Sequence, residues 1–441
     1  MATSFSRIGS ANTYDAAIRN ITARQSALTA LQENLTSGKK VVRPSDDPTA
    51  AANAERALTR IGRIAADQRA LESQRNAILQ AESTLGDITN ALQRFRELVV
   101  NAGNGVHSAA ERRSIAIELQ GLRDEVFSMA NRADTNGLPL FGALGSALKP
   151  FVGPNATAPD YNFNGLPGQQ ATSDVSLPFA LDGDSAFMHQ PGRDKAFNVQ
   201  VTNSTDGLIS TDRTLTTNNV SVTNNALVNT TAALALASAT PVPYPTYTVV
   251  FGPVTPDPVN PTTGPSTVSY TITEVPAVTA GLPITSAPIS FTPGKATSID
   301  ITDIPGMKFT ITGIPKENDT ITVDASVSVF SVMDDAIKDI SAAPNNNGAT
   351  QAVAQALHNI DIGMGRISAI RGQAGDLLNR ADRISSNQEG RSIQLESDRS
   401  RAEDLDMVKG ISDFNNQQTG YSAALQTYAS IQKLSLFNFI S

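Results

Sequence analysis

Cysteine and tryptophan are both absent from this chain of 441 residues, and only 17% of its residues are charged. Because there is no cysteine, disulfides and thiolate metal sites are excluded. This cysteine usage suits a secreted bacterial protein. The net charge of −8, with no dense basic patch to offset it, argues against a nucleic-acid binder.

Long apolar runs are missing as well. No stretch reaches the roughly 18 consecutive apolar residues of a membrane-spanning helix, so we expect no transmembrane segment. The first ten residues contain no apolar core of the kind found in secretory signal peptides. We therefore expect no conventional signal peptide, and a different export route if the protein leaves the cell.

Residues that could carry catalysis or bind a metal are few and scattered. The three histidines, His107, His189 and His358, lie on different segments, and no zinc-protease motif occurs. The acidic clusters 182–184 and 300–303 lack the spacing of a calcium-binding loop. No nucleophile motif is present. We therefore predict a protein that is not an enzyme and has no metal and no cofactor.

An apolar residue recurs at every seventh position from Ala57 to Val99, which predicts one long helix over 48–102. At 1.5 Å per residue this helix is on the order of 80 Å long, so its narrow seam needs a partner helix along its length. That partner is either a second copy or another segment, and Val353–Ala381 has the matching pattern. A third helix is expected over 115–129. The predicted bundle core consists of Ile64, Leu71, Ile78, Leu85, Leu92, Leu119, Leu357, Ile360 and Ile367.

Turn and cap residues separate a first, weaker helix from the long one. Gly38 is placed as the residue that ends the first helix. Asp47 is a good N-cap, and Pro48 fits the first helical turn, with Pro44 in the intervening turn. Further along the chain, the tight turn Asn136-Gly137 is expected to lead into a short edge strand over Leu138–Gly142.

Between residues 148 and 324 the sequence becomes rich in Thr, Ser, Asn, Pro and Gly. Short alternating runs such as Phe197–Val201, Tyr247–Phe251 and Phe309–Ile311 predict antiparallel strands. The stretch Asn224–Ala239 has no clear assignment. The fold class is therefore predicted as α+β: a long antiparallel helical bundle or coiled coil from both chain ends, with an inserted antiparallel β domain.

The two chain ends carry thin, interrupted apolar seams. From Phe414 to Gln432 there is no charged residue, which favours packing in an assembly or lining a narrow wet channel. Because an isolated pair with such seams would be marginal, we expect residues 1–40 and 400–441 to fold on assembly. The predicted assembly interface consists of Ile18, Ile21, Leu28, Leu31, Leu35, Leu405, Val408, Ile411, Phe414, Tyr421, Leu425, Tyr428, Leu434 and Leu436.

Both ends resemble the flagellin superfamily, and within it the hook-associated protein 3 family of the hook–filament junction. The motifs are Leu35–Lys40, Arg43–Pro48 and Leu140–Gly142 near the N-terminus, and Glu403–Asp406 and Tyr428–Ile440 near the C-terminus. The resemblance implies a structural adaptor that joins hook to filament. It also implies type III export through the flagellar apparatus, a chaperone that holds the C-terminal helix, and an extracellular position in the bacterial flagellum. The alternative within the same superfamily is a filament-forming flagellin.

The resemblance further implies three layers. An assembly layer of terminal coiled coil comprises 1–42 with 395–441, and a helical bundle comprises 43–147 with 325–394. A surface β insertion of one or two subdomains comprises 148–324. The implied partners are copies of the chain in a ring, the neighbouring hook-associated protein on the hook side and flagellin on the filament side. An alternative from another class is a secreted adhesin or enzyme whose active part is 150–320, but no catalytic cluster occurs there.

Overall fold

The computed structural model describes residues 10–156, 159–203, 215–260, 264–343 and 345–440; the side chains of 10–13, 203 and 431–440 lie outside this description. The chain divides into two compact units. The first unit comprises residues 1–70 with 383–441, and the second comprises 71–382. Two long helices, α2 (Pro48–Ala102) and α8 (Asn346–Glu403), contribute residues to both units.

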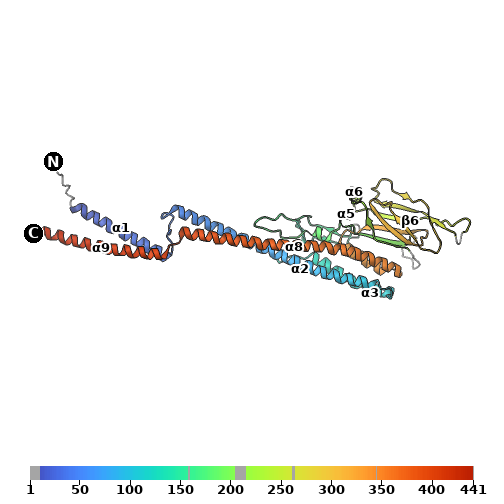
Figure 1. Cartoon of the computed structure of the whole chain (residues 1–441), viewed down its shortest axis with the longest axis horizontal. Coiled ribbons are helices and arrows are strands. Elements are labelled where there is room, and N and C mark those ends of the chain that lie inside the picture. The colour runs from blue at the N-terminus through green and yellow to red at the C-terminus, as the bar shows by residue number, and fades with distance from the viewer. Residues whose placement is uncertain (1–9, 157–158, 204–214, 261–263, 344, 441) are drawn as a thin grey trace. The chain divides into compact units, whose positions relative to one another are not determined.

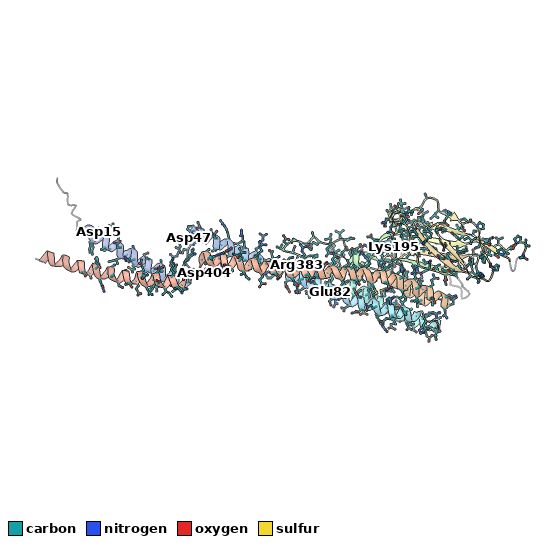
Figure 2. All side chains as sticks on the ribbon, in the orientation of Figure 1. Asp15, Asp47, Glu82, Lys195, Arg383 and Asp404 are labelled. Carbon is teal, nitrogen blue, oxygen red and sulfur yellow. The ribbon has the colours of Figure 1, made fainter. Side chains whose placement is uncertain are left out.

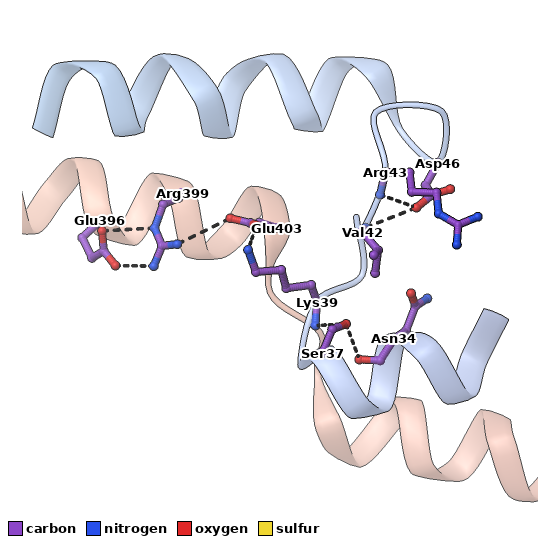
Figure 3. A network of polar contacts seen from close by, with 9 residues as sticks. All are labelled: Asn34, Ser37, Lys39, Val42, Arg43, Asp46, Glu396, Arg399 and Glu403. Atoms are coloured by element: carbon purple, nitrogen blue, oxygen red, sulfur yellow. Dashed lines mark hydrogen bonds and ion pairs between the residues drawn. The ribbon is translucent and has the colours of Figure 1, made fainter. Parts of the chain in front are cut away.

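The first unit is helical (Figure 1). The end of α8 runs beside the start of α2, and α9 (Met407–Ile440) runs beside α1 (Ser10–Ser37) (Figures 1 and 3). Ala54 and Ala57 of α2 are buried, as are Ile384 and Gln388 of α8. Because two of these four residues are alanines and one is polar, this part of the chain buries little apolar surface.

In the second unit, α2 and α8 form an antiparallel pair. Three ion pairs join them: Arg75 to Asp382 at 3.4 Å, Glu82 to Arg371 at 2.7 Å, and Arg96 to Asp361 at 2.9 Å. The numbers rise along α2 as they fall along α8, so the partner of the long helix is the same chain, as the seam of 353–381 predicted. Of the predicted bundle core, Leu71, Ile78, Leu85, Leu92, Leu119, Ile360 and Ile367 are buried, whereas Ile64, in the first unit, and Leu357 are half-buried.

Two further helices complete the bundle. α3 (Ala109–Ala130) begins with the capping box formed by Ser108 and Glu111, and Arg94 of α2 reaches its Glu118 at 3.2 Å. α7 (Val329–Ala342) packs along α3, and Arg123 of α3 pairs with Asp334 of α7 at 2.8 Å. An ion pair and an apolar contact surface therefore hold the segment after the β insertion against the segment before it.

The insertion contains an antiparallel sheet of five strands in the order β3-β13-β6-β8-β9. Their bounds are β3 (Phe197–Asn203), β6 (Thr246–Phe251), β8 (Tyr270–Val275), β9 (Ile284–Thr285) and β13 (Asp319–Ala325). Side chains in β6 alternate between half-buried and buried, which is the period of a strand with one face on a core. Together with the helical bundle, this confirms the predicted α+β class.

A second sheet pairs β11 (Thr297–Ile301) with β12 (Met307–Gly313), and β12 with the short β4 (Thr216–Thr217) and β5 (Ser221–Val222). Both sheets contribute to one apolar core, which includes Tyr247, Ile272 and Ile311. Two strand pairs are separate: β1 (Phe151–Val152) with β2 (Asn162–Phe163), and β7 (Ser266–Val268) with β10 (Ile289–Phe291). The short helices α4 (Gly183–Phe187) and α5 (Pro191–Asp194) precede β3.

Two segments, one before the insertion and one within it, have a conformation that the sequence did not predict. Leu138–Gly142 is not a strand, because only Pro139 and Gly142 make isolated bridges and the segment turns between them. Asn224–Ala239, which had no assignment, contains helix α6 (Asn225–Leu236), whose N-terminus the Asn224 side chain caps. In both segments tertiary contacts or a cap decide the conformation, whereas apolar periodicity is weak.

Helix α8 covers the outer edge of β3 with a row of side-chain amides. Gln351, Gln355 and Asn359 are spaced four residues apart and therefore share one face of the helix. Gln351 Nε2 donates to Val199 O at 3.2 Å, while Gln355 Nε2 and Asn359 Nδ2 donate to Phe197 O at 3.1 and 2.9 Å. The row satisfies carbonyls that an edge strand leaves unpaired, and it joins the insertion to the bundle.

Replacing Gln351 by alanine is expected to destabilise the second unit by about 1–3 kcal/mol, because the buried Val199 carbonyl loses this donor. The Oε1 atom of Gln351 also accepts from Thr217 N at 3.3 Å, so the same change loosens β4. Urea unfolding followed by circular dichroism measures the loss. Ser368→Ala, at an exposed position on the same helix, is the control and should change stability by less than about 0.5 kcal/mol.

Candidate assembly interface

Two segments far apart in the sequence meet where α1 ends and α9 begins. We call residues 38–47 together with 403–406 the joint. Lys40 N donates to Glu403 O at 2.8 Å, and Leu405 N donates to Gly38 O at 2.9 Å. Lys39 and Asp404 form an isolated antiparallel bridge. These backbone contacts hold the last residues of α8 against the segment that leaves α1.

Side chains strengthen the joint (Figure 3). The Glu403 carboxylate pairs with Lys39 and, at 3.5 Å, with Arg399. Lys40 Nζ donates to Arg401 O at 2.6 Å. The Glu403 side chain is only 13% exposed, so its charge is less screened than that of a surface residue.

Turn and cap residues set the ends of the helices at the joint. Gly38 has a φ of +69°, the left-handed conformation that favours glycine and ends α1. Asp47 Oδ1 accepts from the backbone N–H groups of Thr49 and Ala50, both at 3.0 Å, and these bonds hold the pKa of Asp47 below its usual value. Pro48 is the first residue of α2, and Pro44 is exposed in the turn.

The cap of α9 had no sequence prediction. Asp406 Oδ1 accepts from Val408 N at 3.0 Å and Lys409 N at 3.1 Å, so Asp406 starts a new helix inside the segment 395–441 that was assigned to the terminal coiled coil. The signal was present, because aspartate is a preferred N-cap and Leu405-Asp406 precedes a helical pattern. Asp47 and Asp404 mark the two segments of the joint in Figure 2.

The terminal helices bury almost nothing of their own. None of the described side chains of α1 is buried, and Gly410 is the only buried residue among the described part of α9. Val408 is 82% exposed and Ile411 is 49% exposed. Of the other predicted interface residues, Ile18 and Leu425 are exposed. The half-buried ones are Ile21, Leu28, Leu31, Leu35, Leu405, Phe414, Tyr421 and Tyr428; the side chains of Leu434 and Leu436 lie outside the described residues.

Where α1 and α9 touch, the contact is thin. The rings of Tyr14 and Tyr428 lie 5.5 Å apart, and this contact raises the pKa of Tyr428 through a hydrogen bond to Tyr14. Between the helices lies an open groove of about 630 Å³, lined by Ala17, Ile21, Arg24, Gln417 and Ala424, among others. The exposed face of α9 carries amides and hydroxyls without charge over 415–430. Such a surface resembles half of an interface more than the wet face of a monomeric helix.

The other candidate chemical sites have structural roles. Asp182 caps α4 and Asp300 accepts from Thr310 Oγ1 at 2.8 Å, so both serve turns or strand pairs. In the described part of the chain, no three His, Asp or Glu side chains gather as a metal site. Nor is any described helix long and apolar enough to cross a membrane.

His189 is the one buried histidine among the described residues, and its ring lies against the backbone of Ser326. Burial lowers its pKa to about 4; Asp194 opposes this shift, while Arg193 and Arg366 add to it. A protonated or metal-bound ring would face two guanidinium groups. The residue is therefore a neutral core histidine just before α5, and its backbone N–H donates to Val327 O at 2.8 Å.

The buried His189 predicts a pH dependence of stability. Its folded-state pKa of about 4 lies below the ordinary 6.5, so its contribution is fully present above pH 6.5 and is lost as pH falls through 4. His189→Leu should remove this loss. The difference in the free energy of unfolding between the variant and the wild type should therefore shift in favour of the variant by about 1–3 kcal/mol between pH 7.5 and pH 4. Thermal melts of both proteins between pH 4 and 8 measure it; parallel curves would contradict it.

Comparisons with known proteins show similarity to flagellar proteins. Residues 8–144 match the bacterial flagellin N-terminal helical region. Flagellar hook-associated protein 3 of Salmonella typhimurium is 35% identical over 153 residues, which are 33% of this chain and 46% of that protein. The flagellar filament 41 kDa core protein of Borreliella burgdorferi is 33% identical over 120 residues, 27% of this chain and 36% of that protein.

A solved structure shares the fold. Flagellar hook associated protein-3 from Legionella pneumophila has 22% sequence identity and a TM-score of 0.55, and the match covers 78% of this chain and 97% of that one. This chain spans less than half the length of the curated relatives just described. The matches confirm the resemblance to the flagellin superfamily that the terminal motifs carried.

Proposed function

We propose, from the premise that residues 8–144 are a flagellin N-terminal helical region, that this chain is a structural adaptor of the bacterial flagellum, not an enzyme, and joins the hook to the filament. The observation that carries the proposal is that, Gly410 apart, no described residue of the terminal helices is buried. Long helices that bury no apolar side chain of their own gain stability only when other helices cover them.

The proposed assembly uses three layers. The terminal segments 1–42 and 395–441 pack against those of neighbouring copies in a ring. Segments 43–147 and 325–394 form the bundle layer, and 148–324 is the surface insertion. Coupled folding of the ends favours the single geometry in which the exposed Val408, Ile411 and Leu425 are all covered.

The proposed partners follow from this position. A hook-associated protein contacts the ring on the hook side, and flagellin contacts it on the filament side. Before assembly, an export chaperone holds the C-terminal helix, and the chain travels unfolded through the flagellar export apparatus to the outside of the cell. The uncharged, exposed face of α9 supports this proposal, because a chaperone can cover it without burying an unpaired charge.

A deletion strain tests the function. Electron microscopy should show hooks that lack filaments, and the full-length chain supplied in trans should restore them. Quantitative mass spectrometry of isolated flagella separates the adaptor from the alternative, a filament-forming flagellin. An adaptor is present in far fewer copies than the filament protein, and a copy number equal to that of the filament protein would overturn the proposal.

A further inference from the structure

The joint brings together two chain positions that are more than three hundred residues apart. Two segments supply its polar contacts. Lys39 and Lys40 come from the segment after α1, and the Arg401 carbonyl and Glu403 come from the end of α8. We call these four residues the clasp. Glu403 takes part twice, since its carboxylate pairs with Lys39 and its carbonyl accepts from Lys40 N.

The clasp lies at the point where the terminal helices start to run together. Immediately beyond it, Leu35 of α1 and Leu405 pack over Gly410 of α9. A Cβ atom at residue 410 would lie 2.9 Å from Leu405 Cδ2 and 3.2 Å from Leu35 Cδ2. Gly410 thus permits a close approach of the two helices one turn after the Asp406 cap. Further out, the only ring contact between the described parts of α1 and α9 is that of Tyr14 with Tyr428.

Without the clasp, pairing of α1 with α9 would carry an entropic cost. The ends have thin seams and fold fully only on assembly, so in the free chain they pair transiently. Each additional degree of freedom where they leave the joint lowers the effective concentration of one end near the other. The clasp holds the C-terminal end of α1 and the N-terminal end of α9 next to each other before the rest of the two helices makes contact. Pairing then needs only the alignment of two helices that already begin side by side.

We propose that the clasp is a positioning device that couples the two chain ends, so that Lys39 and Glu403 set the pairing of α1 with α9 in the free chain. Its use in the flagellum rests on the proposed function, whereas the coupling itself does not. The charges support a specific arrangement, because Glu403 is the carboxylate on which the cations of both segments converge (Figure 3).

Thiol cross-linking of the full-length free chain tests the coupling. The chain contains no cysteine, so Tyr14→Cys with Tyr428→Cys provides the only two thiols. A short bismaleimide joins them at a rate that reports how often the two ends lie together, even when pairing is transient. In this background, Glu403→Lys places a cation beside Lys39, Lys40 and Arg399, and it should lower the cross-linking rate about fivefold or more.

Charge exchange separates coupling from general damage. Lys39→Glu alone should slow cross-linking as Glu403→Lys does, and the two changes together should restore the rate to within about twofold of the parent. Glu396→Lys is the matched control, because Glu396 pairs with Arg399 on the same helix without touching the N-terminal segment. Circular dichroism melts confirm that the second unit is unchanged.

Each outcome decides the proposal. Loss in both single variants, recovery in the exchange and no loss in the control support it. An unchanged rate in Glu403→Lys, no recovery in the exchange, an equal loss in Glu396→Lys, or no cross-linking in the parent would overturn it. Because the measurement uses free chains, its failure leaves the hook–filament function standing, and a failed deletion-strain test leaves the coupling standing.

Discussion

Deleting residues 422–441 is expected to abolish incorporation of the chain into flagella while leaving the second unit folded. The deleted part of α9 contributes Leu425, which is exposed, and Tyr428, which meets Tyr14. It contributes no buried side chain to the described chain, so the free energy of unfolding of the second unit should change by less than about 0.5 kcal/mol. Immunoblots of purified flagella and thermal melts of the isolated protein measure the two effects.

A pair of point variants narrows this prediction to one face of α9. Leu425→Asp places a charge on the predicted seam and should reduce incorporation at least tenfold, since burying an unpaired carboxylate in an interface costs about 1.4 kcal/mol or more. Gln426→Asp adds the same charge at the neighbouring exposed position, off the seam, and should incorporate normally. Normal filament attachment in the truncated protein, or equal loss in both point variants, would contradict an assembly role for this seam.

The fold of the helical parts could be predicted because local chemistry and global packing agree there. The seven-residue repeat from Ala57 to Val99 specified both a long helix and the need for a partner. The Asp47-Pro48 pair and the Ser108–Glu111 capping box specified where helices begin. The ion pairs with α8 then distinguish a partner within the chain from a second copy, which periodicity alone left open.

The insertion was less predictable because its elements are short. Strands such as β6 were visible through alternation, but their order depends on pairings distant in sequence, such as Val323 with Val199 and with Tyr247. Helix α6 was missed because alanine, threonine and leucine in a low-complexity run give no clear stripe. Its cap, Asn224, and its buried Val228, Thr231 and Ala235 define it.

The joint was predicted in part. Gly38, Pro44, Asp47 and Pro48 carry local signals of turn and cap, so sequence alone placed a break after the first helix. The pairing of Lys39 with Glu403 has no local signal, because it depends on α2 and α8 returning the chain to the same place. Val408, Ile411 and Leu425 are exposed apolar residues of α9 that repeat along one seam, and this repetition is what periodicity detects.

Phe330→Ala is expected to give the largest loss of stability in the second unit, about 3–5 kcal/mol. The ring is fully buried at the start of α7. The centre of the ring lies 5.1 Å from that of Phe127 of α3, 5.3 Å from that of Tyr161, 5.5 Å from that of Phe151 and 5.7 Å from that of Phe187. Its removal leaves a cavity where the bundle, the β1–β2 pair and α4 meet, and rings of this size cannot collapse into the space without leaving their rotamers.

Because the aromatic cluster joins three elements, the loss should be cooperative. Urea unfolding of Phe330→Ala, followed by far-ultraviolet circular dichroism and by tyrosine fluorescence, should show both signals shifted to the same lower midpoint. Ile117→Ala on α3 is the control, since that side chain is 72% exposed and its loss should cost less than about 0.5 kcal/mol. A Phe330→Ala midpoint within error of the wild type would mean that the cluster does not hold α7 to the bundle. Separate midpoints for the two signals would mean that the insertion unfolds independently of the bundle.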